Sequence, residues 1–221
     1  MSPPRPHSQR RNWLGLLALV GLLGTSAPWA LAQSTGTRMG SAAQTAATRE
    51  AIFAGGCFWC MEEAFEKIPG VVSVDSGYTG GQVSNPDYKS VSKGTTGHIE
   101  AIRVTFDPTQ TSYDTLLRHY WANIDPTAEN RQFCDTGPQY RSAIFAMSDE
   151  QLKAAQASKQ ALEQSKRFPK VYTEILMASP FYMAEEYHQD YYRKNPFRYR
   201  YYKSSCGREA RLEQVWGKNR P

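Results

Sequence analysis

The strongest chemical signal in this sequence is a cysteine placed where a strand gives way to a helix. Ala51–Ala54 is a short apolar run, typical of a buried strand, and it stops at Gly55-Gly56. Cys57 follows, at or just before the first turn of a helix. Free backbone N–H groups and the positive end of the helix dipole favour an anion there. We therefore expect Cys57 to be a reactive thiol with a lowered pKa, rather than a buried structural cysteine.

Cys57 and Cys60 also form a C-x-x-C pair, which leaves other interpretations open. One is the dithiol of a thioredoxin-like disulfide oxidoreductase. A zinc site needs a second close pair of ligands, whereas Cys134 and Cys206 stand alone in the sequence, so no metal site is expected. A non-catalytic binding domain with inert thiols is the remaining alternative. Four cysteines allow three complete disulfide pairings, and the sequence does not choose among them.

A carboxylate is predicted to lie on an apolar strand face. Glu100 has the same strand parity as Ile102, Val104 and Phe106, so its side chain should point toward the buried side. A carboxyl group in a poorly solvated site resists ionisation, and its pKa rises. The alternative is a strand-end glutamate that turns to solvent. In the buried arrangement, Glu100 would be a neutral acid at neutral pH.

A nucleophilic thiol facing a neutral acid is suited to the reduction of a sulfoxide. The S–O bond is polarised, with an electrophilic sulfur and a basic oxygen. Attack on the sulfur needs a proton on the oxygen, so the thiol and the acid supply the two halves of the reaction. Cys57 would then become a sulfenic acid, and a second thiol would condense with it to a disulfide.

The elements that would position these groups follow from residue periodicity and capping signals. In chain order we expect a strand at 51–54, a helix from Phe58 to Ile68, a strand at Val72 and Val74, a strand at 100–106, a helix capped by Ser112, a strand at 143–147, a helix from Asp149 to about Lys166 with a Ser148–Gln151 capping box, and a strand from Val171 to Met177. The segments 80–97 and 123–140 and the aromatic tail after Ser179 are predicted to be irregular. The first six elements match the split βαβ pattern of ferredoxin-like folds. We therefore expect an α+β fold with that core, an added helix and strand, and a long irregular C-terminal tail.

The N-terminus has the pattern of an export signal. A basic stretch ends at Arg10-Arg11, an apolar run spans 13–23, and Ala30-Leu31-Ala32 offers a cleavage site before Gln33. The apolar run is short for a bilayer span, which needs about 20 residues. An uncleaved membrane anchor is the alternative. Gln9-Arg10-Arg11 resembles a twin-arginine signal, although paired arginines are also common in ordinary leaders. We expect export to the bacterial periplasm, an oxidising space.

Charge and composition divide the chain at the same place. The net charge is +5, but the first 32 residues contain three arginines and no acid, so 23 basic and 21 acidic residues remain after them. This near balance argues against nucleic-acid binding. Residues 33–49 are small and polar, like a flexible linker. We therefore divide the chain into a signal peptide at 1–32, a linker at 33–49 and a catalytic domain at 51–217.

Four ordered motifs resemble those of the peptide methionine sulfoxide reductases of type A, over about residues 51–217. They are Gly55-Gly56-Cys57-Phe58-Trp59, Gly97-His98-Ile99-Glu100, Asp135-Thr136-Gly137-Pro138-Gln139-Tyr140-Arg141-Ser142 and Ala184-Glu185-Glu186-Tyr187-His188-Gln189-Asp190-Tyr191. The resemblance implies that Cys57 is the nucleophile and Glu100 the acid. It also implies a set of substrate-binding residues. These are Tyr88 and Tyr140 on the sulfoxide oxygen, Phe58 and Trp59 as the wall for the substrate methyl group, and Asp135 on the backbone side of the substrate.

The resemblance further implies action on the S epimer of methionine sulfoxide, free and in proteins, with repair of proteins damaged by oxidative stress. It implies electrons from a thioredoxin-like dithiol donor. We expect no bound cofactor and a monomer, although the sequence does not give the oligomeric state. His98 and His188 are expected to be structural. Which thiol resolves the sulfenic acid stays open between Cys206, in a small-residue stretch of the tail, and Cys60. We favour Cys206, with Cys60 in a relay, and expect Cys134 to be a plain packed thiol.

Overall fold

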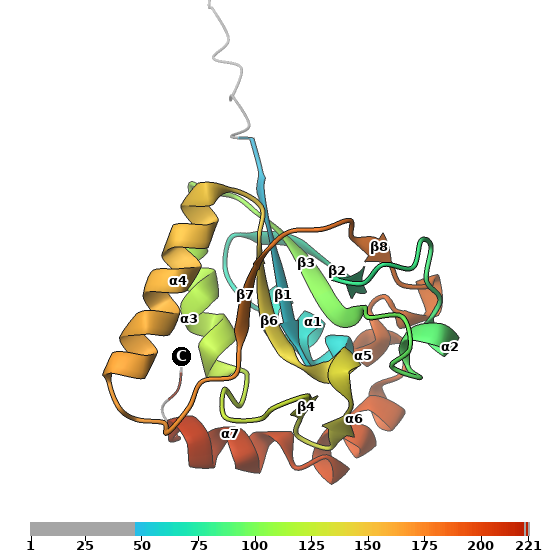
Figure 1. Cartoon of the computed structure of the whole chain (residues 1–221). Helices are drawn as coiled ribbons and strands as arrows, with labels where there is room; N and C mark the ends of the chain where they lie inside the picture. Colours follow the sequence, from blue (N-terminus) through green and yellow to red (C-terminus); the bar gives the residue numbers. More distant parts are fainter. Residues whose placement is uncertain (1–46, 219, 221) are drawn as a thin grey trace, which may run out of the picture. The chain divides into compact units, whose positions relative to one another are not determined.

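The alternating and apolar runs of the sequence form the strands of one six-stranded sheet. The computed structural model describes residues 47–218 and 220, so the expected leader and most of the expected linker lie outside the described residues. The strands are β1 (Arg49–Gly55), β2 (Val71–Thr79), β3 (Ile99–Phe106), β6 (Ser142–Ala146), β7 (Glu174–Met177) and β8 (Tyr182–Met183). Their order in the sheet is β7-β6-β1-β3-β2-β8 (Figure 1).

The inner four strands and two helices confirm the expected core. Helix α1 (Phe58–Glu66) joins β1 to β2, and α3 (Tyr113–Ala122) joins β3 to β6. Strand pairs β1–β3, β1–β6 and β2–β3 are all antiparallel. The resulting order β6-β1-β3-β2 is that of a split βαβ unit, as predicted from the order of elements. The added elements are α4 (Asp149–Gln164) and β7, which pairs in parallel with β6.

The predicted helix caps at Ser112 and Ser148 are present. The Ser112 side chain accepts a hydrogen bond from the Thr115 N–H, and Ser148 accepts one from the Gln151 N–H. Gln151 does not complete the expected capping box, because its side chain accepts from the Met147 N–H and donates to the Glu50 carbonyl. Both hydroxyls satisfy backbone donors that the first turn of a helix leaves free.

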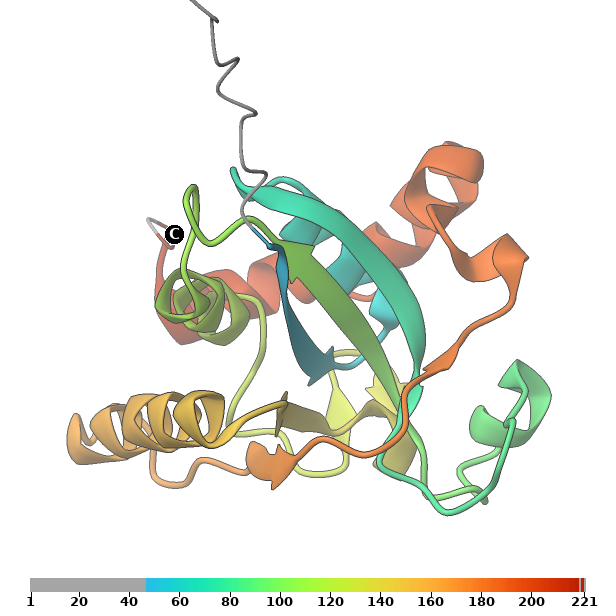
Figure 2. The same cartoon turned by 90° about the horizontal axis from the view of Figure 1, so that it is seen from above.

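The two faces of the sheet are buried by different means. The larger core lies under α1, α3 and α4, and includes Phe53, Phe65, Val104, Leu116 and Ala155. The opposite face carries a smaller cluster of sheet residues, with Phe181 packed against it. Phe181 lies in the connection between β7 and β8, which runs from one edge of the sheet to the other (Figure 2).

The expectation of an irregular C-terminal tail is wrong. The tail contains α5 (Tyr191–Lys194), α6 (Pro196–Ser205) and α7 (Arg208–Trp216), and α6 and α7 run along one end of the sheet, below the strands in Figure 1. Pro196 begins α6 rather than breaking a helix, because the first helical position needs no N–H donor. The predicted loops also contain short elements: α2 (Tyr88–Val91), β4 (Arg131–Gln132), β5 (Asp135–Thr136) and a 3₁₀ turn at Pro138–Tyr140.

The last predicted strand is shorter than expected. Strand β7 begins at Glu174 rather than Val171. The intervening backbone bonds outside the sheet, since the Tyr172 N–H donates to the Pro126 carbonyl and the Thr173 carbonyl accepts from Lys159 Nζ. Within the described residues, the structure contains no helix of the length and apolarity needed to span a bilayer.

Arg208 fastens the C-terminal helices to the sheet. Its side chain is 3% exposed and donates to the Asn123 carbonyl at 2.6 Å and to the Gly55 carbonyl at 3.4 Å. The guanidinium also lies over the Phe133 ring, 4.3 Å from its centroid. Gly55 ends β1 two residues before Cys57, so this cation links α7 to the segment that carries the thiol.

Replacing Arg208 by Ala should therefore destabilise the fold more than removing a surface arginine. Hydrogen bonds to charged groups contribute about 1.5–3 kcal/mol each, and their loss leaves buried carbonyls unsatisfied. We expect Arg208→Ala to lower the free energy of unfolding by at least about 2 kcal/mol, measured by urea denaturation. The matched control is Arg198→Ala, on the exposed side of α6. Equal stability of the two variants would contradict this role for Arg208.

Candidate active site

A glycine pair brings the end of β1 into the first turn of α1. Gly56 has φ +81°, a left-handed conformation that other residues adopt only with strain, and a Cβ there would lie 2.5 Å from Gln132 Cβ. A Cβ on Gly55 would lie 2.6 Å from Met61 Sδ. Cys57 then occupies the N-cap position of α1, as expected from the sequence.

Glu100 lies beside this helix start and is buried. It is the second residue of β3, its side chain is 2% exposed, and its carboxylate accepts a hydrogen bond from the Phe58 N–H at 3.1 Å. Burial raises the pKa of Glu100 to about 8, against the lowering effect of the Phe58 hydrogen bond. The prediction of a buried carboxyl with a raised pKa is confirmed.

The expectation of a lowered pKa for Cys57 is wrong in this state of the site. Burial raises the pKa of the Cys57 thiol well above its usual value, and the hydrogen bond to Cys60 and the carboxyls of Glu100 and Asp135 add to the effect. The helix start does not compensate, because the Phe58 N–H donates to Glu100, and α1 makes no cap hydrogen bond to the Cys57 side chain. The same thiol contact lowers the pKa of Cys60 to about 7, with help from the Arg208 cation.

A small cavity collects most of the predicted site residues. It has a volume of about 50 Å³, somewhat more than one water occupies, which suits a methyl sulfoxide group. Its lining consists of Cys57, Phe58, Trp59, Tyr88, Glu100, Asp135, Tyr140 and Tyr202. All five predicted substrate-binding residues therefore surround the predicted nucleophile and acid. A larger hollow of about 250 Å³ between the starts of α3 and α4 has no cysteine among its described lining residues.

The two tyrosines reach the cavity from segments that were predicted to be loops. Tyr88 begins α2, and Tyr140 ends the 3₁₀ turn. Burial raises the pKa of Tyr88 to about 12 and that of Tyr140 further, with the Glu100 charge as the next cause, so both phenols keep their protons. Glu185 holds Tyr88 in place by accepting from its backbone N–H at 2.8 Å. Two protonated hydroxyls therefore face the same small space as Glu100.

The aromatic wall is braced by the fourth sequence motif. The Trp59 indole N–H donates to His188 Nδ1 at 3.1 Å, and the Tyr191 ring stacks on Trp59 with 3.7 Å between centroids. The Phe58 ring packs against His188 at 5.0 Å. Both residues belong to the fourth sequence motif, in which His188 is expected to be structural and Tyr191 has no predicted role. Their role is to fix the orientation of the wall, so the expectation that His188 is structural is confirmed.

Tyr202 is a cavity residue that the sequence did not reveal. It lies on α6, and its hydroxyl donates to Asp135 Oδ2 at 2.6 Å and makes a hydrogen bond with Cys57. Burial raises the pKa of both groups. Nothing in the local sequence distinguishes Tyr202 from the other tyrosines of the tail, because only the folded position of α6 brings it to the thiol.

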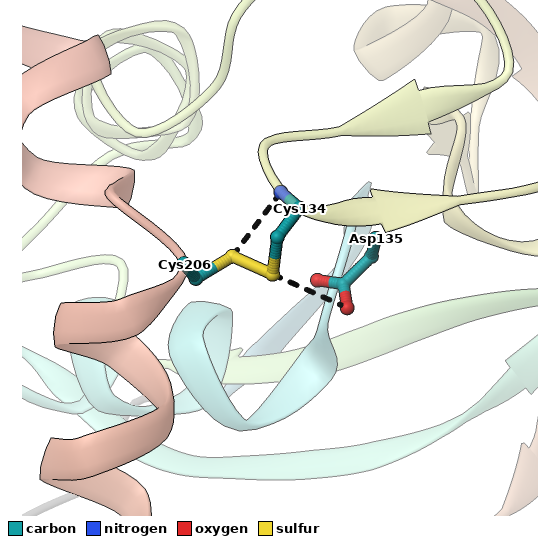
Figure 3. A group of neighbouring side chains, drawn as sticks. All are labelled: Cys134, Asp135 and Cys206. Carbon is teal, nitrogen blue, oxygen red and sulfur yellow. Dashed lines mark hydrogen bonds between the residues drawn. A yellow bond between two sulfur atoms is a disulfide. The ribbon is translucent and has the colours of Figure 1, made fainter.

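The four cysteines form two pairs. Cys60 hydrogen-bonds with Cys57 one helical turn away, and the two are 4% and 6% exposed. Cys206 is bonded to Cys134, with 5.0 Å between their Cα atoms (Figure 3). The expectation that Cys134 is a plain packed thiol is therefore wrong. The favoured resolving thiol, Cys206, does not contact Cys57 here, whereas the alternative, Cys60, does.

Two groups of side chains have the spacing of metal ligands, but their atoms are engaged elsewhere. In the first group, Cys134 and Cys206 are joined in the disulfide, and Asp135 accepts a hydrogen bond from the Tyr202 hydroxyl. In the other group, Glu62 accepts from the Asp190 N–H and the Ser76 hydroxyl, and Glu66 is paired with Arg193 at 2.8 Å. The donor sets that the structure describes are thus committed to the protein, and we derive no metal chemistry from them.

Comparison with known proteins identifies relatives over the whole described domain. A family model described as peptide methionine sulfoxide reductase matches residues 49–220. Peptide methionine sulfoxide reductase MsrA 2 of Caulobacter vibrioides is 45% identical over 208 residues, which cover 94% of this chain and 99% of that protein. Peptide methionine sulfoxide reductase MsrA of Bacillus licheniformis is 52% identical over 169 residues, covering 76% and 93%.

Solved structures agree with the sequence relatives. The reduced form of Mxr1 from Saccharomyces cerevisiae has a TM-score of 0.64 at 36% identity, and covers 67% of this chain and 86% of its own. Methionine sulfoxide reductase A of Corynebacterium diphtheriae has a TM-score of 0.62, also at 36% identity, with coverages of 67% and 76%. The chain therefore belongs to the type A peptide methionine sulfoxide reductases, thiol-dependent oxidoreductases that act on methionine (S)-S-oxide.

Proposed function

We propose that Cys57 attacks the sulfoxide sulfur while Glu100 gives the oxygen its proton. The observation that carries this proposal is the shared cavity, where the thiol and a carboxyl with a pKa of about 8 face the same 50 Å³ of space. Cys60 does not line the cavity, so Cys57 is the sulfur that a substrate meets. The Tyr88 and Tyr140 hydroxyls donate to the sulfoxide oxygen, and Phe58 and Trp59 surround the methyl group.

The first half of the reaction transfers the oxygen atom to Cys57. The thiol and the sulfoxide yield a Cys57 sulfenic acid and a thioether, so sulfur is oxidised on the enzyme and reduced on the substrate. Cys57 releases its thiol proton toward Cys60, its hydrogen-bond partner, whose pKa of about 7 fits a proton acceptor. The neutral Glu100 protonates the oxygen, so that no negative oxygen has to form in a buried site.

The second half of the reaction converts the Cys57 sulfenic acid into a disulfide and releases water. Cys60 gives up the proton that it took from Cys57 and attacks the Cys57 sulfenic sulfur, and the same proton leaves with the hydroxide as water. Cys60 is placed for this step, because it lies one helical turn from Cys57, and Cys57 is the N-cap, outside the regular helix. A small shift of the first turn brings the two Cβ atoms from the usual helical spacing of about 5–6 Å to the roughly 3.5–4.5 Å that a disulfide needs. We therefore assign direct resolution to Cys60 in place of the initially favoured Cys206.

Substrates and electron source are also proposals. The cavity accepts only the end of a side chain, so free methionine sulfoxide and exposed sulfoxides in proteins both fit. Each sulfoxide consumes two electrons, so a thioredoxin-like dithiol must return the enzyme disulfide to its thiol form. We propose that the enzyme acts as a monomer. Since type A enzymes reverse a common lesion of methionine, we propose repair of oxidised proteins as the physiological role.

We further propose that the protein acts in the bacterial periplasm. Support comes from the basic, apolar and small-residue pattern of residues 1–32. The likeness to the Caulobacter protein extends over 208 residues, more than the stretch from residue 47 to the end, so it reaches into the N-terminal segment.

If Glu100 is the acid, the Glu100→Gln variant should reduce sulfoxide more slowly and should show a different dependence of the rate on pH. Glutamine keeps an acceptor for the Phe58 N–H but cannot give up a proton, so the single-turnover rate should fall about 10²- to 10⁴-fold. In the unaltered enzyme, Glu100 is protonated below its pKa of about 8 and ionised above it. The rate should therefore decline as the pH rises through about 8, and the variant should lack this decline. Glu129→Gln, an exposed surface change, is the control. An unchanged rate in Glu100→Gln would remove the acid role.

The resolving role predicts that Cys60→Ser completes one turnover and then stalls. The variant should release about one methionine per chain and retain a Cys57 sulfenic acid that a 1,3-dione reagent captures. Cys57→Ser should release none, which controls for background reduction. Sustained thioredoxin-driven turnover by Cys60→Ser would instead return the direct resolving role to Cys206.

Export predicts a shortened mature protein. N-terminal sequencing of the protein recovered from the periplasm of a bacterial host should begin at Gln33, and Arg10→Lys with Arg11→Lys should hold the chain in the cytoplasm if it uses the twin-arginine route. Continued export of the double variant would favour the general route. A chain that keeps Met1 and fractionates with membranes would contradict cleavage and support the anchor.

A further inference from the structure

Glu62 is a buried carboxyl that the proposed mechanism does not use. It lies on α1, five residues after Cys57, and is 1% exposed. It is not among the described residues that line the catalytic cavity. Burial raises the pKa of Glu62 to about 7, against the lowering effect of its hydrogen bond from the Asp190 N–H. Because a buried polar group is costly unless it is hydrogen-bonded, its partners indicate what it does.

The two oxygens of Glu62 connect three parts of the domain. Oε1 accepts from the Asp190 N–H at 2.8 Å, and Asp190 is the N-cap of α5 and part of the fourth motif (184–191). Oε2 accepts from the hydroxyl of Ser76, a residue of β2, at 3.3 Å. Glu62 is thus the point where α1 meets both the neighbouring strand and the fourth motif.

The Asp190 amide lies between the two residues that hold Trp59. His188 accepts from the indole N–H, and the Tyr191 ring stacks on the indole with 3.7 Å between centroids. Asp190 has φ +53°, a left-handed conformation that aspartate adopts more readily than most residues but still at a cost. The turn that brings both rings to the indole therefore depends on contacts around Asp190, and Glu62 supplies one of them.

Ser76 attaches the same motif to the sheet. Its N–H donates to Gln189 Oε1 and its carbonyl accepts from Gln189 Nε2, both at 2.9 Å. The carbonyl also accepts from the Ala184 N–H at 2.9 Å. The fourth motif is thus fixed to β2 near both of its ends, and Glu62 links this strand-bound segment to α1, the helix that carries Trp59.

We propose that Glu62 is a positioning residue, which sets the orientation of the Trp59 wall and thereby the preference of the enzyme for a methyl group on the sulfoxide sulfur. It acts through Asp190, which places His188 and Tyr191 on the indole, and it does not touch the reacting atoms. This inference rests on the proposed role of the aromatic wall in binding the methyl group.

The role requires the reach of the side chain rather than its charge. Glutamine at position 62 keeps an oxygen for the Asp190 N–H, and its amide can donate to the Ser76 hydroxyl, which also accepts. Aspartate keeps the charge but is one methylene shorter, so its oxygens lie too far from that amide. Leucine fills a similar volume but leaves the amide without this acceptor. Glu62→Gln should therefore preserve the wall, whereas Glu62→Asp and Glu62→Leu should release it.

A loosened wall should weaken substrate binding without slowing the chemical step. The methyl group is present before and during the reaction, and loss of such uniform binding raises KM at unchanged kcat. In single turnover, Glu62→Leu and Glu62→Asp should need about 10-fold more methionine sulfoxide for half of the limiting rate, and that limiting rate should change less than about threefold. The decline of the rate through pH about 8 should persist. Loss of this decline, or a limiting rate that falls about 10-fold, would overturn the proposal.

Ethionine sulfoxide, which carries an ethyl group in place of the methyl group, tests the wall directly. One additional methylene in a fitted pocket changes kcat/KM about 10- to 200-fold. The unaltered enzyme and Glu62→Gln should prefer methionine sulfoxide within this range, and Glu62→Leu and Glu62→Asp by roughly threefold or less. A preference that survives in the last two variants would overturn the role of Glu62 alone. An unaltered enzyme with no preference would overturn the wall, and with it the function on which this inference rests.

The emission of Trp59 reports on the wall without any turnover. Comparing each variant with and without Trp59→Phe isolates this indole from the other tryptophans. We expect emission at longer wavelength and stronger quenching by acrylamide in Glu62→Leu and Glu62→Asp, because the indole loses its partners, and neither change in Glu62→Gln. Glu163→Leu, on the exposed side of α4, is the matched control. Urea denaturation identifies the folded variants, and an unchanged Trp59 signal in folded Glu62→Leu or Glu62→Asp would overturn the proposal.

Discussion

The active site depends on one hydrogen bond, from the Phe58 N–H to the Glu100 carboxylate. It connects the first amide of α1 to the second residue of β3, and it is possible because β1, which leads into α1, pairs directly with β3. The glycine pair before Cys57 lets the chain turn tightly enough to place that amide over the strand. Burial still outweighs this hydrogen bond, so the carboxyl remains an acid at neutral pH. Cys57, as the N-cap of the same helix, is held beside that acid.

The same hydrogen bond determines where negative charge resides. A helix start normally stabilises a thiolate, but here its first amide serves Glu100, and Cys57 stays a thiol in a desolvated cavity. The lower pKa belongs to Cys60, which lies near the Arg208 cation. The cavity that receives the substrate is thus formed by a neutral acid, a neutral thiol and protonated tyrosines. A sulfoxide is uncharged, so this site binds it without burying an unpaired charge.

Much of this arrangement could be predicted from the sequence, because it depends on local patterns. Strand alternation placed Glu100 on the buried side, capping residues located two helices, and the order of elements gave the core topology. The raised pKa of Cys57 could not be predicted, because burial outweighs the local effect of the helix start, whose first amide donates to Glu100 instead. The Cys134–Cys206 bond joins residues 72 apart, and only the folded positions of the β4–β5 turn and the end of α6 select it over the other pairings.

The C-terminal tail escaped prediction for a different reason, and that reason bears on its role. Aromatic and charged residues occur on all sides of α6, so the apolar periodicity that reveals a helix is weak there. Those side chains serve the site instead of a separate core: Tyr202 bonds to Cys57, and Tyr199 bonds to Cys60 and donates to Glu63 at 2.6 Å. Helix α6 therefore contacts both Cys57 and Cys60, and it ends at Cys206, which is bonded to Cys134. The disulfide at Cys206 therefore restrains the end of the helix whose tyrosines contact Cys57 and Cys60.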